Sequence, residues 1–330
     1  MSKQFSHTQF AHCESGVVSA LLSYYGLKIS EPMAFGITST LSFVYLPIVK
    51  LNGLPLIAYR QLPKNIIKNI ERTLGVKIYK KQYKNILDAS LELERLVQNE
   101  QKLVGLQTSV FYLPYMPEDM RFHFNAHNLL VYGKEEDNYK ISDPVFENEV
   151  ECSAKDLTIA RFAKGVFAPK GFLYYPTYIP KTLDFITVLK KAIRKNAKSM
   201  TTPFPFAGIK GMRRLARKII MLQNTKDERY IKKYLTNIVR MQEEIGTGGG
   251  GFRFLYAAFL QEAISYGLDQ YKLEKASDLM TQSGDTLRKF ALACVQSSKN
   301  FEQFDAKKLS SILVEVSNIE EEAYKILKSI

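Results

Sequence analysis

The chain has 330 residues, of which 46% are apolar, so it is long enough for two domains with hydrophobic cores. The sequence contains no run of about 18 apolar residues, which excludes a transmembrane helix. Its N-terminal residues have no apolar segment of signal-peptide type, and its three cysteines are too irregularly spaced for a disulfide framework or a zinc site. We therefore expect a cytoplasmic protein with no metal and no bound cofactor.

The net charge of +13 is concentrated in one segment. Residues 181–240 contain 16 Lys plus Arg against 3 acidic residues, a difference of +13 that equals the whole excess. Such a segment attracts polyanions, which include nucleic acid, an anionic membrane surface and an acidic protein. No zinc-finger pattern or RNA-recognition signature accompanies it, so nucleic acid is not the favoured partner. A solvated, lysine-rich helical face is the alternative.

The stretch from Phe10 to Gly26 joins a reactive polar cluster to an apolar helix pattern. Its apolar residues fall on one helical face, at Val17, Val18, Leu21, Leu22 and Tyr25. Gly26 provides the stop, so Cys13 is predicted to lie at the helix N-terminus. There the unpaired N–H groups and the macrodipole favour a thiolate, and the same groups can hold an oxyanion. A small cysteine packed under a helix is the alternative.

The next elements alternate between helix and strand. Helices are predicted over 30–36, 65–75 and 86–100, and strands over 40–47, 76–82, 102–107 and 109–115, with Pro47 ending the first strand. A domain boundary is expected near 175–181, where two prolines precede the basic segment. Beyond it, helices are predicted over 183–199, 210–223, 227–244 and 252–267, followed by three more helical segments.

Residues 122–146 predict a hairpin with two candidate catalytic residues. His127 opens an apolar run, a polar turn follows, and an alternating strand ends at Asp143 before Pro144. In an antiparallel pair these two positions are neighbours, which suits a base and the carboxylate that orients it. Alone, His127 would be an ordinary strand histidine and Asp143 an ordinary turn residue. Together with Cys13 they occur in the papain-like order of nucleophile, base and orienter.

Three further residues lie near the expected nucleophile. Gln9 is a candidate oxyanion-hole donor, because papain-like enzymes place a glutamine a few residues before the cysteine. A surface loop glutamine explains it equally well. His12 and Glu14 flank Cys13 and are candidates for substrate contact or for tuning the thiol, although helix capping explains Glu14 as well.

Several motifs resemble the BtrH family of butirosin-biosynthesis acyltransferases. In the N-terminal half these are HCES (12–15), EPMAFG (31–36), FYLPY (111–115) and the hairpin HNLLVYG…ISDP. In the C-terminal half they are GIKGMRRLA (208–216) and EEIGTGGGGFRFLYAAFLQEA (243–263). The resemblance implies an α+β protein with a papain-like catalytic domain over 1–178 and an all-α domain over 179–330. It also implies Cys13 as nucleophile, His127 as base and Asp143 as orienter.

The run GTGGGG over 246–251 matches a dinucleotide fingerprint literally, but a charged helix and not a strand precedes it, so we reject that interpretation. A tight turn between helices, or a contact with substrate or carrier, explains it better. Candidate substrate- or carrier-binding residues, taken from these motifs, are Tyr115, Arg213, Arg214, Glu243, Gly248 and Arg253.

The resemblance implies an acyltransferase of secondary-metabolite or lipid-like product assembly. It would take an acyl group from a phosphopantetheine thioester, carried by a carrier protein or by CoA. It would then pass this group to an amine or hydroxyl of a small molecule. An acidic acyl carrier protein would dock on the basic segment, which could also contact a membrane surface. The alternatives are a papain-like amidase or peptidase and a non-catalytic module that binds a carrier protein.

Overall fold

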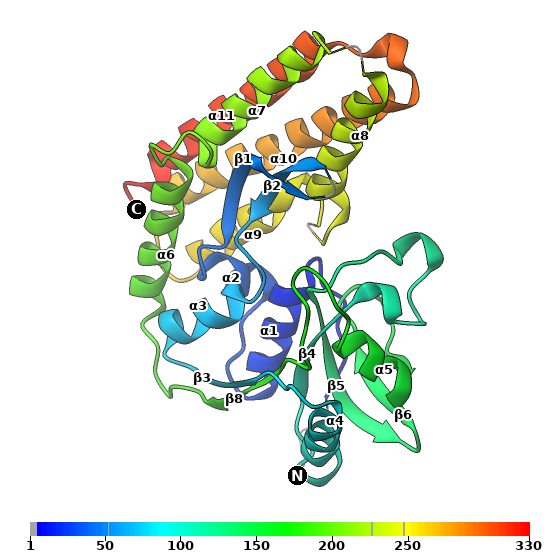
Figure 1. The fold of residues 1–330 in the computed structure, drawn as a ribbon. Coiled ribbons are helices and arrows are strands. Elements are labelled where there is room, and N and C mark those ends of the chain that lie inside the picture. The colour runs from blue at the N-terminus through cyan, green and yellow to red at the C-terminus, as the bar shows by residue number, and fades with distance from the viewer. Residues whose placement is uncertain (1–4, 52, 226, 247) are drawn as a thin grey trace. The chain divides into compact units, whose positions relative to one another are not determined.

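The computed structural model of this protein describes residues 5–51, 53–225, 227–246 and 248–330. The chain divides into two compact units: Met1–Ala34 with Pro63–Leu183, and Phe35–Leu62 with Asp184–Ile330. The chain changes unit three times, and the third change, between Leu183 and Asp184, lies close to the boundary predicted after residue 178. The prediction missed, however, that 35–62 belongs to the second unit, so the two parts are interleaved in sequence. Figure 1 shows the elements of each unit.

The first unit is built on an antiparallel sheet of six strands in the order β3-β8-β4-β5-β6-β7. Every neighbouring pair in this sheet is antiparallel. The strands are β3 (Lys77–Lys81), β4 (Val104–Thr108), β5 (His127–Glu135), β6 (Asn138–Ser142), β7 (Val150–Ser153) and β8 (Leu173–Tyr178). Strands β5 and β6 form the predicted hairpin.

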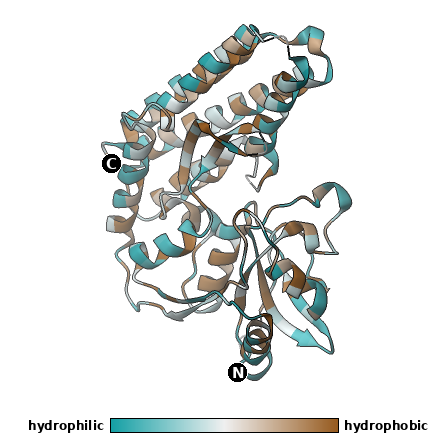
Figure 2. Cartoon of the chain, viewed as in Figure 1, coloured by the Kyte–Doolittle hydropathy of each residue, from teal (hydrophilic) through white to brown (hydrophobic). Residues whose placement is uncertain are grey.

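Helices cover this sheet, and α1 (Cys13–Tyr24) packs on β4, β5 and β8. The other elements of this part are α2 (Glu31–Gly36), which crosses into the second unit, α3 (Asn65–Leu74), α4 (Ile86–Glu94), η1 (Arg95–Asn99), η2 (Val110–Tyr112), η3 (Glu118–Met120) and α5 (Ala154–Arg161). A buried apolar cluster joins one sheet face to α4, η1 and α5. In Figure 2, α1 and β5 each carry stretches of the hydrophobic colour between white or teal ones.

The second unit is helical except for one hairpin, β1 (Leu41–Leu51) with β2 (Leu54–Arg60). Its helices are α6 (Phe185–Met200), α7 (Gly208–Leu222), α8 (Glu228–Val239), η4 (Arg240–Glu244), η5 (Gly250–Phe252), α9 (Arg253–Ile264), α10 (Gln270–Lys299), η6 (Phe301–Gln303) and α11 (Ala306–Leu327). The C-terminal residues are therefore all-α, as predicted. Within the described ranges, no helix has the length and apolar character needed to cross a bilayer.

The prediction that Pro47 ends a strand was wrong. Strand β1 continues to Leu51, and its pairing with β2 shifts register between Leu46 and Lys50. Such an irregularity lets a proline remain within an edge strand because no ladder N–H is required of it.

Two other strand assignments also differ. Residues 109–115 were expected to be a strand, but they form the 3₁₀ turn η2, because the Ser109 N–H donates to the Ala160 carbonyl and not to a neighbouring strand. Residues 175–178, expected to be linker, complete β8, where Tyr175 pairs with Tyr79. Pro176 is tolerated there because β4 pairs with β8 only as far as Tyr174.

A buried ion pair lies at the centre of the second unit. Arg253 donates from Nε to Glu320 Oε1 at 2.7 Å and from Nη2 to Oε2 at 3.2 Å. Its Nη1 donates to the Gly251 carbonyl, and Ser283 Oγ donates to Glu320 at 2.8 Å. Both charged side chains are fully buried. The partners of each charge are therefore all internal, which is the arrangement that makes a buried pair tolerable.

Replacing Glu320 with alanine should destabilise the second unit strongly, because it leaves the Arg253 guanidinium buried without its carboxylate. We expect Glu320→Ala to lower the free energy of unfolding by about 3–5 kcal/mol in urea denaturation. Glu322→Ala is the matched control on the same helix, since Glu322 pairs with Lys275 at the surface and should cost less than about 1 kcal/mol. Equal losses for the two variants would contradict this account.

Candidate active site

Cys13 is the first residue of α1, as the sequence predicts. The preceding His12 caps the helix: its Nδ1 accepts from the Ser15 N–H at 3.3 Å and lies 2.8 Å from Ser15 Oγ. The Cys13 side chain is 6% exposed. The thiol is therefore buried and lies at the positive end of the dipole of α1.

His127 and Asp143 meet at the open end of the β5–β6 hairpin. His127 is the first residue of β5, and Asp143 directly follows the last residue of β6. The register pairs Leu130 with Ser142, so the two side chains are diagonal neighbours and do not stand directly opposite each other. The Nε2 of His127 donates to Asp143 Oδ2 at 2.7 Å. The contact inferred from the hairpin pattern is present.

The Asp143 carboxylate is fully buried and receives three donors. Besides His127, the Tyr115 hydroxyl donates to Oδ2 at 2.9 Å, and the Val145 N–H donates to Oδ1 at 3.1 Å. Burial raises the pKa of Tyr115 well above its usual value, and the neighbouring Asp143 charge raises it further. Tyr115 therefore remains a neutral donor, which gives this candidate ligand-binding residue a definite position beside the histidine–carboxylate pair.

The pKa of His127 rises from 6.5 to about 10. Burial alone would lower it, but the charge and hydrogen bond of Asp143, together with the hydrogen bond and charge of Cys13, outweigh burial. Because Nε2 is engaged by Asp143, the ring presents Nδ1 to the sulfur. An imidazolium ion held in this way at neutral pH favours a thiolate on the group that it faces.

A carboxylate that sequence reasoning missed holds the loop before the nucleophile. Glu31 accepts from the backbone N–H groups of Ala11 at 2.9 Å and His12 at 2.7 Å, and from Ser15 Oγ at 3.0 Å. Burial raises the pKa of Glu31, and these donors oppose the rise. The only signal in the sequence was an acidic residue at the start of the motif EPMAFG.

His12 and Glu14 have structural positions. His12 is 2% exposed and caps α1. Glu14 is fully buried, and its Oε1 accepts from the Ile66 N–H at 3.0 Å, which fixes the start of α3. Direct substrate contact by either side chain stays a prediction. Glu14 does hold a helix start, but that of α3 and not that of its own helix α1.

Gln9 lies beside the segment that carries Asp143. Its Nε2 donates to the Val145 carbonyl at 3.0 Å, and the Phe10 N–H donates to the Pro144 carbonyl at 2.9 Å. These bonds connect the residues before Cys13 to the end of the hairpin. A primary amide carries a second N–H, so the oxyanion-hole assignment for Gln9 stays a prediction.

The arginine candidates in the second unit are engaged by their own unit. Arg213 donates to Ser317 Oγ, Asn318 Oδ1 and Glu321 Oε2 of α11. The guanidinium of Arg214 lies 4.3 Å from the centre of the Phe206 ring. Direct ligand contact by Arg253 is wrong, because this side chain is fully buried in its pair with Glu320. Other basic residues of the segment 181–240 are exposed, among them Lys190, Lys191, Lys195 and Lys198 on α6, Lys210 and Arg217 on α7, and Arg229 and Lys233 on α8.

The glycine-rich run 246–251 is a turn between helices. The helical turn η4 precedes it and η5 begins within it at Gly250, so no strand leads into the run, which agrees with the rejection of the dinucleotide interpretation. Glu243 accepts from the Gly250 N–H through both carboxylate oxygens, at 3.2 and 3.0 Å. Gly248 is exposed and has φ of 64°, which favours glycine. Thr247 lies outside the described residues, and ligand contact by this turn stays a prediction.

The other two cysteines are placed differently from Cys13. Both are buried and free of disulfides. Burial raises the pKa of Cys152 to about 12 and raises that of Cys294 still further. Neither is therefore a nucleophile at neutral pH. No group of three or more His, Cys, Asp or Glu side chains within the described ranges could hold a metal ion.

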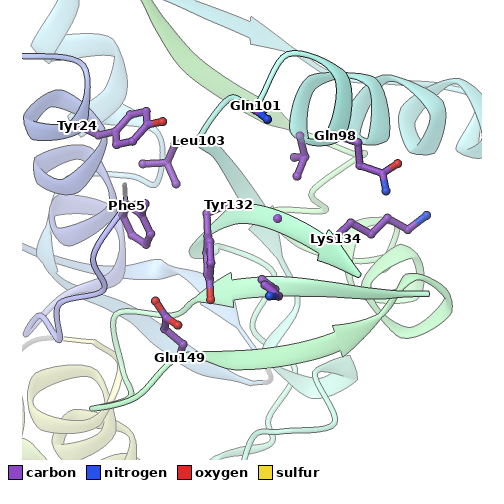
Figure 3. A pocket seen from close by; sticks show the side chains of 11 residues that line it. Phe5, Tyr24, Gln98, Gln101, Leu103, Tyr132, Lys134 and Glu149 are labelled. Atoms are coloured by element: carbon purple, nitrogen blue, oxygen red, sulfur yellow. The ribbon is translucent and has the colours of Figure 1, made fainter. Parts of the chain in front are cut away.

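A cavity of about 680 Å³ in the first unit lies away from Cys13. Figure 3 shows Phe5, Tyr24, Leu103 and Tyr132 among its lining residues. Tyr24 is the last residue of α1, and a helix of 12 residues spans about 17 Å, so this cavity is at the far end of the helix from the thiol. We do not assign it to the Cys13 site.

The first unit is a papain-like fold. A helix with a cysteine at its N-terminus packs on an antiparallel sheet, and a histidine–aspartate pair at the strand ends faces that cysteine. The chain belongs to the BtrH-like family. The family model "Butirosin biosynthesis protein H, N-terminal" matches residues 12–144, and the model "Domain of unknown function (DUF4872)" matches residues 155–327, which is more than half of the chain.

Among solved structures, the chain is similar to a crystal structure described as a C39-like peptidase from Bacillus anthracis, with 14% identity, 54% of this chain and 96% of that chain covered, and a TM-score of 0.35. Among curated proteins, no significant match is found.

Asp143→Asn should reduce the reactivity of Cys13 at neutral pH. Without the carboxylate, the pKa of His127 should fall toward 6.5, so at about pH 7.5 only about a tenth of the rings would be protonated. We expect iodoacetamide to alkylate Cys13 about tenfold more slowly at this pH. Intact-protein mass spectrometry measures the rate. An unchanged pH profile would contradict the role assigned to Asp143.

Glu31→Gln should impair the Cys13 site although Glu31 is assigned no contact with the thiol. The amide places an NH₂ group among donors that need an acceptor, which should displace the Ala11–His12 backbone. We expect slower alkylation of Cys13 by about tenfold, with the fold retained by circular dichroism. The conservative variant Glu31→Asp should recover part of the rate. Wild-type reactivity in Glu31→Gln would show that this carboxylate serves stability alone.

Proposed function

We propose that this protein is an acyltransferase that carries the acyl group on Cys13. The observation that supports this most is the hydrogen-bonded His127–Asp143 pair facing Cys13 at the N-terminus of α1. The family match adds support, because the resemblance to butirosin biosynthesis protein H implies acyl transfer in secondary metabolism. The proposed donor is a phosphopantetheine thioester on a carrier protein or CoA, and the proposed acceptor is an amine or hydroxyl of a small molecule.

The proposed reaction has two steps with opposite proton transfers. In the first step the Cys13 thiolate attacks the thioester carbonyl, a new carbon–sulfur bond forms, and the donor thiol leaves with the proton of His127. In the second step the acceptor amine attacks the acyl-enzyme, His127 takes its proton, and the Cys13 thiolate is released. The first step exchanges one thioester for another and is close to thermoneutral. Amide formation then drives the second step forward.

The developing oxyanion needs donors beside the sulfur. The Cys13 N–H in the first turn of α1 and the Gln9 amide are the proposed pair. Asp143 does not take the proton in this scheme: it keeps the imidazole oriented and stabilises its charged form. Tyr115 and Val145 hold the carboxylate in turn.

An acidic carrier protein is the proposed partner of the second unit. The exposed lysines of α6 offer a cationic stripe, whereas the neighbouring Arg213 is already paired with Glu321. Complementary charge would raise the association rate of such a partner. A cytoplasmic location belongs to the same proposal, since its three cysteines are free and a carrier protein would be met there.

Two other functions remain in view. The same cysteine, histidine and aspartate would serve an amidase or peptidase if the donor were an amide and the acceptor water. A non-catalytic carrier-binding module is the second alternative. It gives no reason for the Cys13–His127 contact, and it predicts an unreactive thiol.

Incubation with acyl-pantetheine thioesters tests the proposal. We expect a mass increase of one acyl group on the wild-type protein, its absence in Cys13→Ala, and its discharge by added amines. Cys152→Ala is the matched control and should load normally, because Cys152 is buried and burial raises the pKa of its thiol to about 12. No adduct from free or carrier-bound thioesters, together with cleavage of amide substrates, would replace the transferase by the amidase.

A further inference from the structure

A second cavity, of about 300 Å³, lies beside the candidate site within the first unit. Its lining includes Pro63, Lys64, Gln82, Gln107, Phe167 and Lys170. Two connections place it near the nucleophile. Gln107 precedes Thr108, which pairs with His127 in the ladder. Lys64 precedes α3, whose Ile66 N–H donates to Glu14, the residue after Cys13.

Gln107 brings an unsatisfied amide to this cavity. Its side chain is 1% exposed, and neither Nε2 nor Oε1 has a hydrogen-bond partner among the described residues. The next two residues, Thr108 and Ser109, also have buried hydroxyl groups without partners there. A buried polar group without a partner costs stability, and an apolar side chain of the same shape would avoid that cost. Of these three residues only Gln107 lines the cavity, so its amide is the group that a polar ligand bound there would satisfy.

Two lysines supply positive charge to the same cavity. Lys64 is partly buried, and its ammonium lies 4.3 Å from the centre of the Phe172 ring, whereas Lys170 is exposed. Burial lowers the pKa of Lys64; Glu14 opposes this and the charge of Lys170 adds to it. The two ammonium groups thus repel each other, with Glu14 as a partial counter-charge. An anion bound between them would relieve this repulsion.

The backbone around the cavity is held in an unusual conformation. Lys64, Phe167 and Lys170 all have positive φ, at 70°, 57° and 54°, although none is glycine. Hydrogen bonds fix the loop that contains the last two. Asn125 Nδ2 donates to the carbonyls of residues 164 and 166, and the Tyr83 N–H donates to the Lys170 carbonyl. Strain of this kind persists only where the surroundings impose it, and it often accompanies ligand sites.

We propose that this cavity binds an anionic oxygen group, a carboxylate or a phosphate, at the end of the acyl group that is delivered to Cys13. Lys64 and Lys170 would neutralise the charge, and the Gln107 amide would donate to one of its oxygens. The acyl-group part of this inference rests on the proposed function, whereas the anion site itself does not. It predicts selection of the acyl group by its terminal charge.

Two thioesters that differ only at their far end test the selection. Adipoyl- and hexanoyl-pantetheine have chains of the same length, and only the first ends in a carboxylate. We expect adipoyl to load Cys13 about tenfold faster, measured by quenched-flow mass spectrometry. Lys64→Gln with Lys170→Gln should abolish the preference. Lys68→Gln should keep it, since Lys68 is an exposed lysine on α3 that does not line this cavity.

Gln107→Leu separates ligand binding from a structural role. If the amide serves a ligand, the variant should lose the adipoyl preference while its melting temperature stays the same or rises, because an unsatisfied buried group has been removed. A retained preference in this variant would overturn the role of Gln107. Equal loading of the wild type by both thioesters would overturn the anion site while leaving the acyltransferase in place.

If neither thioester loads the protein, free anions test the anion site. Adipate and inorganic phosphate are then tested for protection of Cys13 against iodoacetamide. Protection that is lost in the double lysine variant would support the anion site although the proposed function had failed, and the better protector would identify carboxylate or phosphate. No protection by either anion would overturn the inference.

Discussion

The hydrogen bond between His127 and the buried Asp143 carboxylate is the interaction on which the candidate site depends. A carboxylate with no exposure is tolerable only when donors surround it, and here a ring nitrogen, a phenol and a backbone N–H all point at it. Its charge keeps the histidine protonated far above the usual range. Since the same bond occupies Nε2, it also determines which ring nitrogen faces the cysteine.

Two more buried carboxylates organise the opposite side of the site. Glu31 holds the backbone that leads into α1, and Glu14 fixes the start of α3. Neither is assigned a contact with a reacting atom. Both set the position of the α1 N-terminus relative to the sheet, so the thiol, the imidazole and the acid belong to one rigid unit built around β4, β5 and β6. Catalysis by positioned groups needs such rigidity, because small displacements of a nucleophile are costly.

The three candidate catalytic residues could be predicted from the sequence because each lies next to a recognisable local pattern. Cys13 precedes a clear helix period, and His127 and Asp143 bracket a hairpin. The roles of Glu31 and Gln107 could not be predicted from the sequence. Glu31 binds backbone groups about 20 residues earlier in the chain, and Gln107 stands out only because its buried amide has no partner among the described residues.

Pro176 was misread as linker because nothing local reveals that β4 stops pairing before it. The inclusion of residues 35–62 in the second unit is likewise a matter of long-range packing. Arg253 looked like a ligand contact because the sequence does not show its partner Glu320, 67 residues later.

The central claim is that the His127–Asp143 pair activates Cys13 as a nucleophile at neutral pH. Ultraviolet absorbance of the thiolate, followed from acid to alkaline pH in wild type and in Cys13→Ala, tests it most directly. Burial keeps Cys152 and Cys294 protonated over this range, so the difference between the two proteins reports Cys13 alone. The account predicts one thiolate per molecule in the wild type at neutral pH. A thiolate that appears only in the alkaline range of an ordinary cysteine would contradict it.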